Sequence, residues 1–255
     1  MPSFHSLPLL SLSAIGTVLT FNTAVHAAPA ETAPAELLAV LEQVELAANE
    51  RDIDAVMALY AANFENSDGF TYETLEATLP QLWERYDSLQ YRIELQSWED
   101  ADGSYVAETV TYIDGIQEEP RDLVLESVIR SRQRLNDGKI VFQEVLSERN
   151  QLSSGLDSPD VFVILPERVA PGESYGFDAI VQEPLGDRYL LGAALDEGTT
   201  PEDFFTPRPL DLELLSAGGL FKQGVAPDQA DNLWISGLLI RNDALVVITR
   251  RLRVE

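Results

Sequence analysis

A glutamate and a tyrosine near the middle of the chain are the best candidates for catalytic side chains. Glu108 and Tyr112 fall on one face of the strand expected over residues 104–114, and Glu126 holds a similar position in the next expected strand. If this face points into the protein, burial would raise the pKa of the Glu108 carboxyl. The carboxylate could then act as a general base on a small molecule, beside the Tyr112 hydroxyl.

The same acids also have a structural interpretation. Arg130 and Arg132 lie at alternate positions of the strand expected beside Glu108. Acids and arginines on neighbouring strands form cross-strand ion pairs when their face of the sheet is exposed. We therefore expect either a buried base or an ion pair at Glu108, depending on which face of the sheet is covered.

Composition excludes most other catalytic chemistry. The sequence has no Cys, and its two histidines, His5 and His26, lie in an N-terminal segment that we expect to be removed. A chain without His or Cys lacks the usual nucleophile–histidine pairs and the usual zinc and copper ligands. We expect no metal site and no cofactor.

Four aromatic residues form a second candidate site. If the first half encloses a pocket, its mouth or floor would be lined by Tyr60, Trp83, Tyr86 and Tyr91, which could stack on a small apolar ligand. Aromatic residues at helical or strand spacing also form ordinary core. Both interpretations stay open on the sequence alone.

Helical patterns precede strand patterns in the first half of the chain. Asp52 and Thr71 are expected helix N-caps, and Pro80 should kink or interrupt the helix that follows Thr71. Apolar residues recur at helical spacing over residues 37–48, 53–60 and 75–86. Alternation of period two, with Asp-Gly turn signals, then predicts a curved antiparallel sheet with strands over residues 89–98, 104–114, 121–135 and 139–149.

The pattern of the second half predicts an all-β structure. A linker at residues 151–160 precedes short apolar runs separated by Pro and Gly, at 161–165, 175–181, 188–195, 210–215, 219–224, 233–240 and 244–254. Runs of this length and spacing predict an immunoglobulin-like sandwich, although the Cys–Trp–Cys pattern of antibody domains is missing.

The stretch "TRRLR" (249–253) is a dense basic cluster in a very acidic chain. Strand alternation sends Arg251 and Arg253 to one face and Arg250 to the other. The cluster is expected either on a solvated edge strand or docked on acidic surface of the first half. We favour such an intramolecular role over contact with an external anionic partner.

Residues 1–27 have the character of an export signal. They contain no Asp, Glu, Lys or Arg, residues 7–21 are an apolar run, and the small residues Val25 and Ala27 suit cleavage after Ala27. The run is too short for a stable membrane span. We expect an exported protein, in the periplasm, the thylakoid lumen or outside the cell, with no membrane span in the mature chain.

The charge balance argues against one class of partner. The chain has 43 Asp and Glu against 17 Lys and Arg, for a net charge of −26. A surface this acidic repels phosphate backbones and anionic lipid headgroups, so we expect no nucleic-acid partner.

The first half resembles the nuclear transport factor 2 / SnoaL-like superfamily. The resemblance covers roughly residues 35–150 and implies a cone-shaped α+β domain. It rests on "LLAVLEQVELAANERDIDAVMALYAANF" (37–64), "LWERYDSLQYRIEL" (82–95) and "SRQRLNDGKIVFQEVLSE" (131–148). The whole chain is also similar to uncharacterised exported cyanobacterial proteins that join such a domain to a β-rich tail. The superfamily includes isomerases, dehydratases and hydrolases beside non-enzymatic members, and none of its catalytic residues can be matched to positions here.

These patterns together predict an α+β protein with a signal peptide over 1–27, a cone-shaped nuclear transport factor 2-like domain over 35–150 and a β-sandwich over 158–255. We expect an exported, non-catalytic binding or interaction protein that holds a small apolar ligand in the cone, contacts a protein partner, or forms a homodimer. The alternative is an isomerase, dehydratase or hydrolase that uses a Glu/Tyr pair without metal or cofactor.

Overall fold

The computed structural model of the chain describes residues 27–154, 158–206, 209–216 and 218–255. The expected export signal lies outside the described residues, apart from Ala27. The helices are η1 (Ala30–Thr32), α1 (Ala35–Glu50), α2 (Ile53–Ala58), α3 (Tyr72–Trp83) and α4 (Pro201–Phe205). The strands of the first half are β1 (Ala28–Pro29), β2 (Tyr60–Asn66), β3 (Ser88–Ala101), β4 (Ser104–Gln117), β5 (Leu123–Asn136) and β6 (Lys139–Ser153). Those of the second half are β7 (Val161–Ile164), β8 (Arg168–Val169), β9 (Ser174–Val181), β10 (Leu190–Gly198), β11 (Glu213–Leu214), β12 (Gly219–Val225), β13 (Asp231–Arg241) and β14 (Ala244–Val254).

The two helix caps expected in the first half are confirmed, whereas Pro80 does not interrupt its helix. The Asp52 carboxylate accepts a hydrogen bond from the Ala55 N–H at 3.0 Å and caps α2. Thr71 caps α3 in a capping box with Thr74, and Pro80 is accommodated inside that helix, which ends at Trp83. The third helix is therefore shorter than its apolar pattern suggested.

The four predicted strands of the first half are also confirmed, as β3 to β6. Their hairpins turn at Asp102–Gly103 and Asp137–Gly138, where all four residues have positive φ, between 48° and 89°. Asp-Gly pairs suit such turns because Gly adopts positive φ without steric cost and Asp tolerates it.

The predicted fold class is wrong: the two halves are not a cone followed by a separate immunoglobulin-like sandwich. A single 11-stranded sheet runs through both, in the order β1-β3-β4-β5-β6-β14-β13-β10-β11, with β2 paired to β6 and β8 paired to β14. The junction is an antiparallel ladder in which residues 149–153 of β6 pair with residues 246–250 of β14. Because β6 continues to Ser153, the start of the expected linker is strand.

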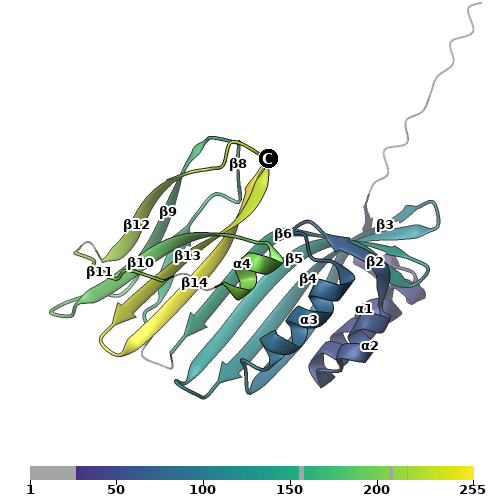
Figure 1. Cartoon of the computed structure of the whole chain (residues 1–255), viewed down its shortest axis with the longest axis horizontal. Coiled ribbons are helices and arrows are strands. Elements are labelled where there is room, and N and C mark those ends of the chain that lie inside the picture. Colours follow the sequence, from purple (N-terminus) through teal and green to yellow (C-terminus); the bar gives the residue numbers. More distant parts are fainter. Residues whose placement is uncertain (1–26, 155–157, 207–208, 217) are drawn as a thin grey trace, which may run out of the picture.

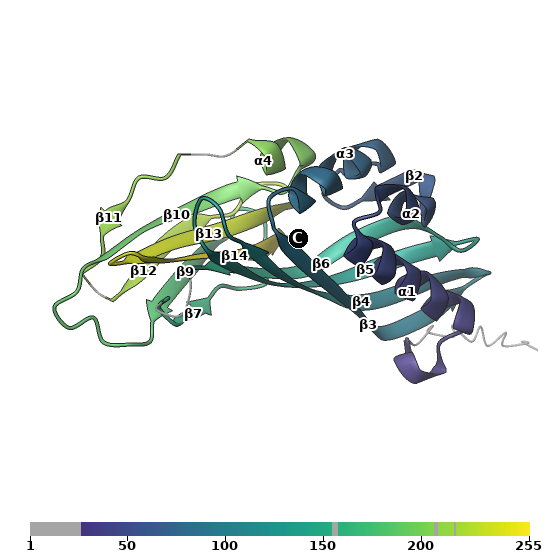
Figure 2. The same cartoon turned by 90° about the horizontal axis from the view of Figure 1, so that it is seen from below.

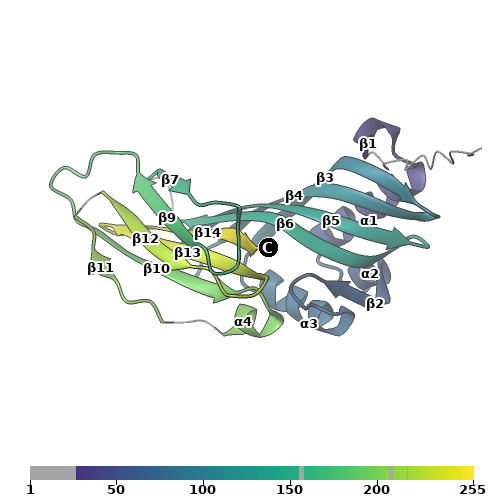
Figure 3. The ribbon, with the colours of Figure 1, turned by 90° about the horizontal axis from the view of Figure 1, so that it is seen from above.

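The two halves of this sheet are covered on opposite faces. Helices α1, α2 and α3 cover one face of β3 to β6, called the inner face here, and α4 lies beside α3. A three-stranded sheet in the order β12-β9-β7 covers β14, β13 and β10 from the other side, the outer face. Figure 3 shows the C-terminal end of the chain at the middle of the molecule, where the halves join.

Each half has its own hydrophobic core. Under the helices the core includes Leu37, Val56, Phe64, Leu135 and Ile140. Between the two sheets of the second half it includes Phe177, Leu190, Ile235, Ile248 and Leu252. Covering opposite faces leaves the outer face of β3 to β6 open, and Ile116, Val124 and Val128 are exposed there.

Candidate functional site: the seam between β6 and β14

The edge of β6 is shared between two partners, and buried charged side chains meet in the gap between them. Near its start, β6 pairs with β2 in parallel, with Asn66 opposite Gln143. Near its end it pairs with β14. We call the gap the seam: residues 144–148 of β6, residues 251–254 of β14 and the turn that follows β2.

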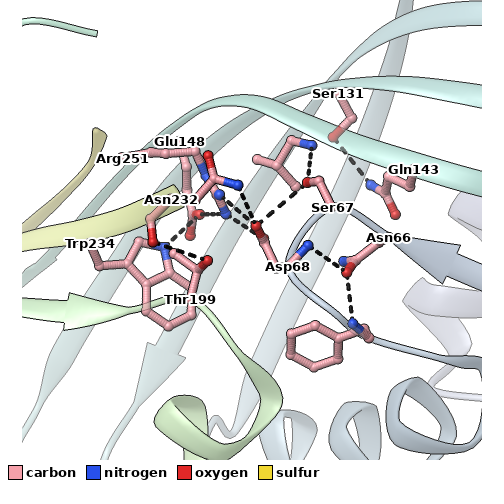
Figure 4. A network of polar contacts seen from close by, with 12 residues as sticks. Asn66, Ser67, Asp68, Ser131, Gln143, Glu148, Thr199, Asn232, Trp234 and Arg251 are labelled. Atoms are coloured by element: carbon pink, nitrogen blue, oxygen red, sulfur yellow. Dashed lines mark hydrogen bonds and ion pairs between the residues drawn. The ribbon is translucent and has the colours of Figure 1, made fainter. Parts of the chain in front are cut away.

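A buried arginine closes the seam. The Arg251 guanidinium donates to both carboxylate oxygens of Asp68, at 2.9 and 2.7 Å, and to Oε2 of Glu148 at 3.1 Å. The three side chains are only 1%, 4% and 10% exposed, respectively. Figure 4 shows how these groups converge from β14, the turn after β2 and β6. The network therefore ties the C-terminal strand to two elements of the first half.

Further hydrogen-bond donors contact the carboxylates of Glu148 and Asp68. Trp234 Nε1–H donates to Glu148 Oε2 at 2.8 Å, and Asn150 Nδ2 donates to Glu148 Oε1 at 2.7 Å. Asn232 Nδ2 donates to Asp68 Oδ1 at 3.1 Å. Buried carboxylates need this number of donors to offset their lost hydration.

The sequence after β2 holds Asp68 in place through a local turn. Asn66 Oδ1 accepts from the N–H groups of Asp68 and Phe70, at 3.0 and 2.8 Å, which is an Asx-type turn. The N–H of Ser67 donates to the Gln143 carbonyl at 2.9 Å and fixes the turn against β6. The sequence NSDG thus presents one acid to the seam.

The local charges favour the ionised arginine. Burial by itself would lower the pKa of Arg251, but the hydrogen bonds and charges of Asp68 and Glu148 outweigh it and raise that pKa. The Nε atom of Arg251 is buried and has no hydrogen-bond partner among the described residues.

Arg250, the preceding residue, faces the opposite side of β14. One of its terminal nitrogens donates to the backbone carbonyls of Asn150 and Thr249, both at 3.0 Å. No carboxylate of the described residues forms an ion pair with it. Burial, together with the positive charge of Arg149, lowers its pKa to about 10.

A cleft of about 320 Å³ opens on this outer side of the seam. Strand β7 and the segment after it form one wall, and β6 and β14 form the other. We call it the seam cleft; its lining residues are Ser147, Glu148, Arg149, Val161, Phe162, Val163, Leu165, Pro166, Glu167, Arg250 and Arg251. It therefore combines an apolar wall with cationic side chains, the composition typical of a binding site for an amphipathic ligand.

The structure places Glu108 on the outer face, away from the helices. Its carboxylate accepts from Arg130 at 2.7 Å and from Arg132 at 3.1 Å, as in the structural interpretation of the sequence. Burial opposes ionisation of Glu108, but the two arginines outweigh it and hold the pKa of the carboxyl below its usual range. The condition for a desolvated base, an inward-facing carboxylate, is not met.

Tyr112 shares the outer face but not the contacts of Glu108. The Arg92 guanidinium lies 3.9 Å from the centre of the Tyr112 ring, and the Tyr112 hydroxyl donates to Glu94 at 3.4 Å. Glu126 is exposed on this face, opposite Asp114 of β4. The three residues therefore lie on one face without forming a shared site.

The four aromatic candidates lie in or against the core of the first half. Tyr60 stacks edge-on against Phe64, with ring centroids 4.8 Å apart, and burial raises the pKa of Tyr60 to about 12. Trp83 Nε1–H donates to the Tyr91 hydroxyl at 3.0 Å, and Tyr86 packs against the same core. None of these residues lines the seam cleft.

Two further observations concern the described residues only. No group of three or more His, Cys, Asp or Glu side chains comes together there in a way that could hold a metal ion. Nor does that part of the chain contain a helix long and apolar enough to cross a membrane.

The docking on acidic surface of the first half that was expected for the basic cluster is confirmed for Arg251 and Arg253 but not for Arg250, and β14 is not an edge strand. Arg251 contacts Asp68 and Glu148, and Arg253 donates to Glu144 at 2.7 Å. Sequence reasoning did not identify the acidic partners of Arg251. The pattern around Asp68 predicts a turn, and nothing in the sequence distinguishes Glu148 from the many other acids of the chain. The seam cleft was missed because its walls come from distant segments.

Comparisons with known proteins add little about activity. Residues 157–255 match a protein-family model described as a domain of unknown function (DUF8623). No curated protein matches the chain.

Several solved structures are similar to part of it. One is a Bdellovibrio bacteriovorus protein, Bd1075, at 17% identity and a TM-score of 0.32, with 43% of this chain and 38% of that one covered. A Mycobacterium tuberculosis epoxide hydrolase of the LEH-like type is 15% identical, with a TM-score of 0.32 and coverages of 43% and 80%. A nuclear transport factor 2-like protein of unknown function from Pseudomonas putida is 14% identical, with a TM-score of 0.34 and coverages of 46% and 87%.

Proposed function

We propose that this protein is a non-catalytic binding protein whose ligand occupies the seam cleft and carries an anionic group. The observation that carries the proposal is Arg250, a partly buried cation that lines the cleft without a carboxylate partner among the described residues. Acids outnumber bases by 43 to 17 in this chain, yet no carboxylate of the described residues forms an ion pair with this guanidinium. An anionic ligand would supply the missing charge through charge-assisted hydrogen bonds.

The shape and lining of the cleft support the proposal. Its volume of about 320 Å³ suits a small ligand or a short segment of chain. Val161, Val163 and Leu165 offer apolar surface opposite the arginines. A ligand with an apolar body and one negative group would contact the apolar wall with its body and the arginines with its charge.

The acids around the cleft favour binding over chemistry. Glu148 is held by Arg251 and Trp234, and Glu167 accepts from Arg149 at 3.2 Å. Both carboxylates already accept hydrogen bonds within the protein, so they are less available to take a proton from a substrate.

A matched pair of fluorescent probes tests the proposal. 8-Anilinonaphthalene-1-sulfonate carries a negative group, and N-phenyl-1-naphthylamine has the same aromatic body without it. We expect the sulfonate to bind at one saturable site and to bind about tenfold more weakly to Arg250→Gln, which corresponds to one lost charge-assisted hydrogen bond. Binding of the neutral probe should be the same in both proteins.

The control variant is Arg121→Gln, which removes an exposed arginine from the turn between β4 and β5. It should bind the sulfonate as the unchanged protein does. Equal affinities in Arg250→Gln and the unchanged protein would exclude the seam cleft as the anion site.

We also propose that the protein acts outside the cytoplasm. The apolar run over residues 7–21 and the small residues before Ala28 support export. N-terminal sequencing of the protein from its native source should then start near Ala28, and an intact Met1 on the folded protein would contradict export.

A further inference from the structure

The exposed edge of β7 suggests which kind of ligand the seam cleft accepts. Strand β7 ends the three-stranded sheet and pairs only with β9 among the described strands. Its sequence, VFVI, contains no charge, Pro or Gly. Natural edge strands are normally protected by such residues or by a covering segment, because a bare edge pairs readily with another strand.

The other end of this molecule shows that protection. The edge of β3 is covered by β1, where Ala28 and Pro29 pair with Trp98 and Ser97. Strand β12, at the far side of the three-stranded sheet, carries Lys222, which pairs with Asp196 at 2.7 Å. The edge of β7 has no covering strand among the described residues, and its four residues carry no charge.

The backbone of β7 has hydrogen-bonding groups at its open edge that pair with no other described strand. The Gln182 N–H donates to the carbonyl of Asp160, one residue before β7, at 2.9 Å. Bonded positions alternate along an antiparallel ladder, so the even-numbered residues of β7 bond to β9. The N–H and C=O groups of Val161 and Val163 therefore point to the open edge, and both residues line the seam cleft.

The side chains of β7 determine which residues of an added strand would face outward and which would face the cleft. Phe162 and Ile164 point away from the core and are 56% and 48% exposed. On the added strand, side chains beside these two residues would lie on the outside and gain apolar contact. The intervening side chains would point across the cleft toward Arg149 and Arg250 of the facing wall.

We propose that the ligand is an extended peptide segment of another protein that adds a strand to β7 and places a carboxylate against Arg250. This inference rests on the proposed function, because it uses the same cleft and the same cation. Main-chain hydrogen bonds to Val161 and Val163 supply affinity, and alternating apolar and acidic side chains supply specificity. A second copy of this chain fits less well, because its own β7 brings no acid and each copy carries a net charge of −26.

The test uses the folded protein and a set of labelled peptides in fluorescence anisotropy. Acetyl-Val-Glu-Val-Glu-Val-amide should bind and compete with the anilinonaphthalene sulfonate. The Gln analogue should bind about tenfold more weakly, and so should an analogue N-methylated on the amides of one edge. The Gln analogue with a free C-terminus distinguishes a terminal carboxylate from a side-chain carboxylate as the anionic group.

Two variants of one residue test the backbone contact. Val163→Pro removes the N–H at the open edge without touching the ladder to β9, and Val163→Ala keeps it. We expect Val163→Pro to weaken peptide binding about tenfold and Val163→Ala to change it less than threefold. Circular dichroism should show both variants folded.

The outcomes separate this inference from the proposed function. If the sulfonate binds through Arg250 but no peptide competes with it, the peptide inference is overturned and the proposed function stands. If neither probe nor peptide binds, both are overturned. A dimer in sedimentation analysis that Val163→Pro disrupts, without peptide binding, would make a second copy the occupant and would also overturn the inference.

Discussion

Arg250 and Arg251 are consecutive residues with opposite environments. Arg251 reaches the inner face and is buried between Asp68 and Glu148. Arg250 lies on the outer face at the seam cleft and donates only to backbone carbonyls among the described residues. Strand alternation alone separates them, since successive side chains of a strand point to opposite faces.

The contrast shows how one basic cluster can serve two purposes. A cation whose charge is balanced within the chain joins parts of the fold, and its loss should appear as lost stability. A cation left without an acid has charge available for another molecule, and its loss should appear as lost binding. Stability measurements on matched variants of the two arginines therefore test whether their roles differ.

The largest effect is expected for Arg251→Met. Removing the guanidinium leaves Asp68 and Glu148 buried without their cation, which should lower the free energy of unfolding by about 3–5 kcal/mol. Urea unfolding, monitored by circular dichroism, measures this decrease in the free energy of unfolding. Arg250→Met, the matched control, should cost less than about 1 kcal/mol, because no acid loses its partner. Equal losses in the two variants would remove the distinction between the two arginines.

A smaller effect is expected for Trp234→Phe. The substitution removes the indole N–H that donates to the charged Glu148, and such a bond contributes about 1.5–3 kcal/mol. Trp98→Phe is the control, because its N–H donates at 3.1 Å to the neutral and exposed Thr32 hydroxyl. Thermal unfolding should show the first variant clearly less stable than the second. If Trp98→Phe costs as much, Glu148 does not depend on the indole.

The smallest effect is expected for Glu108→Gln, which extends the comparison to an ion pair at the surface. Arg130 and Arg132 are about half exposed, so the loss at neutral pH should be below about 1 kcal/mol. The folded state lowers the pKa of Glu108 from its ordinary value of 4.5. The contribution is therefore present above pH 4.5 and disappears as the pH falls through the lower, folded-state value.

Unfolding of Glu108→Gln and the unchanged protein should be compared at neutral pH and in acid. The two curves should converge in acid, because the carboxyl group is then protonated and no longer attracts the arginines. Glu126→Gln is the control, since Glu126 is exposed and forms no ion pair with another described residue. A difference between the Glu108 curves that persists or grows in acid would contradict the role of the ion pair.

Much of the local structure was predictable, and the errors share one cause. Caps at Asp52 and Thr71, and turns at Asp102 and Asp137, depend on neighbouring residues and were identified correctly. The face of β4 that carries Glu108 depends on where the helices pack, which alternation does not reveal. Residues 151–153 look like linker, yet they are strand because β14 pairs with them.

The amino-acid sequence was sufficient to predict the helix caps, strands β3 to β6 and the placement of Arg250 and Arg251 on opposite faces. These follow from residue types and short-range periodicity. Only the tertiary structure decided that β6 accepts β14, that Asp68 and Glu148 meet Arg251, and that β7 stands open beside Arg250. Such contacts join residues that are far apart in the chain: Glu148 and Arg251 are separated by 103 positions, and Asp68 and Arg251 by 183. Nothing in the local pattern of either residue specifies the other, because the pairing depends on how the whole sheet assembles.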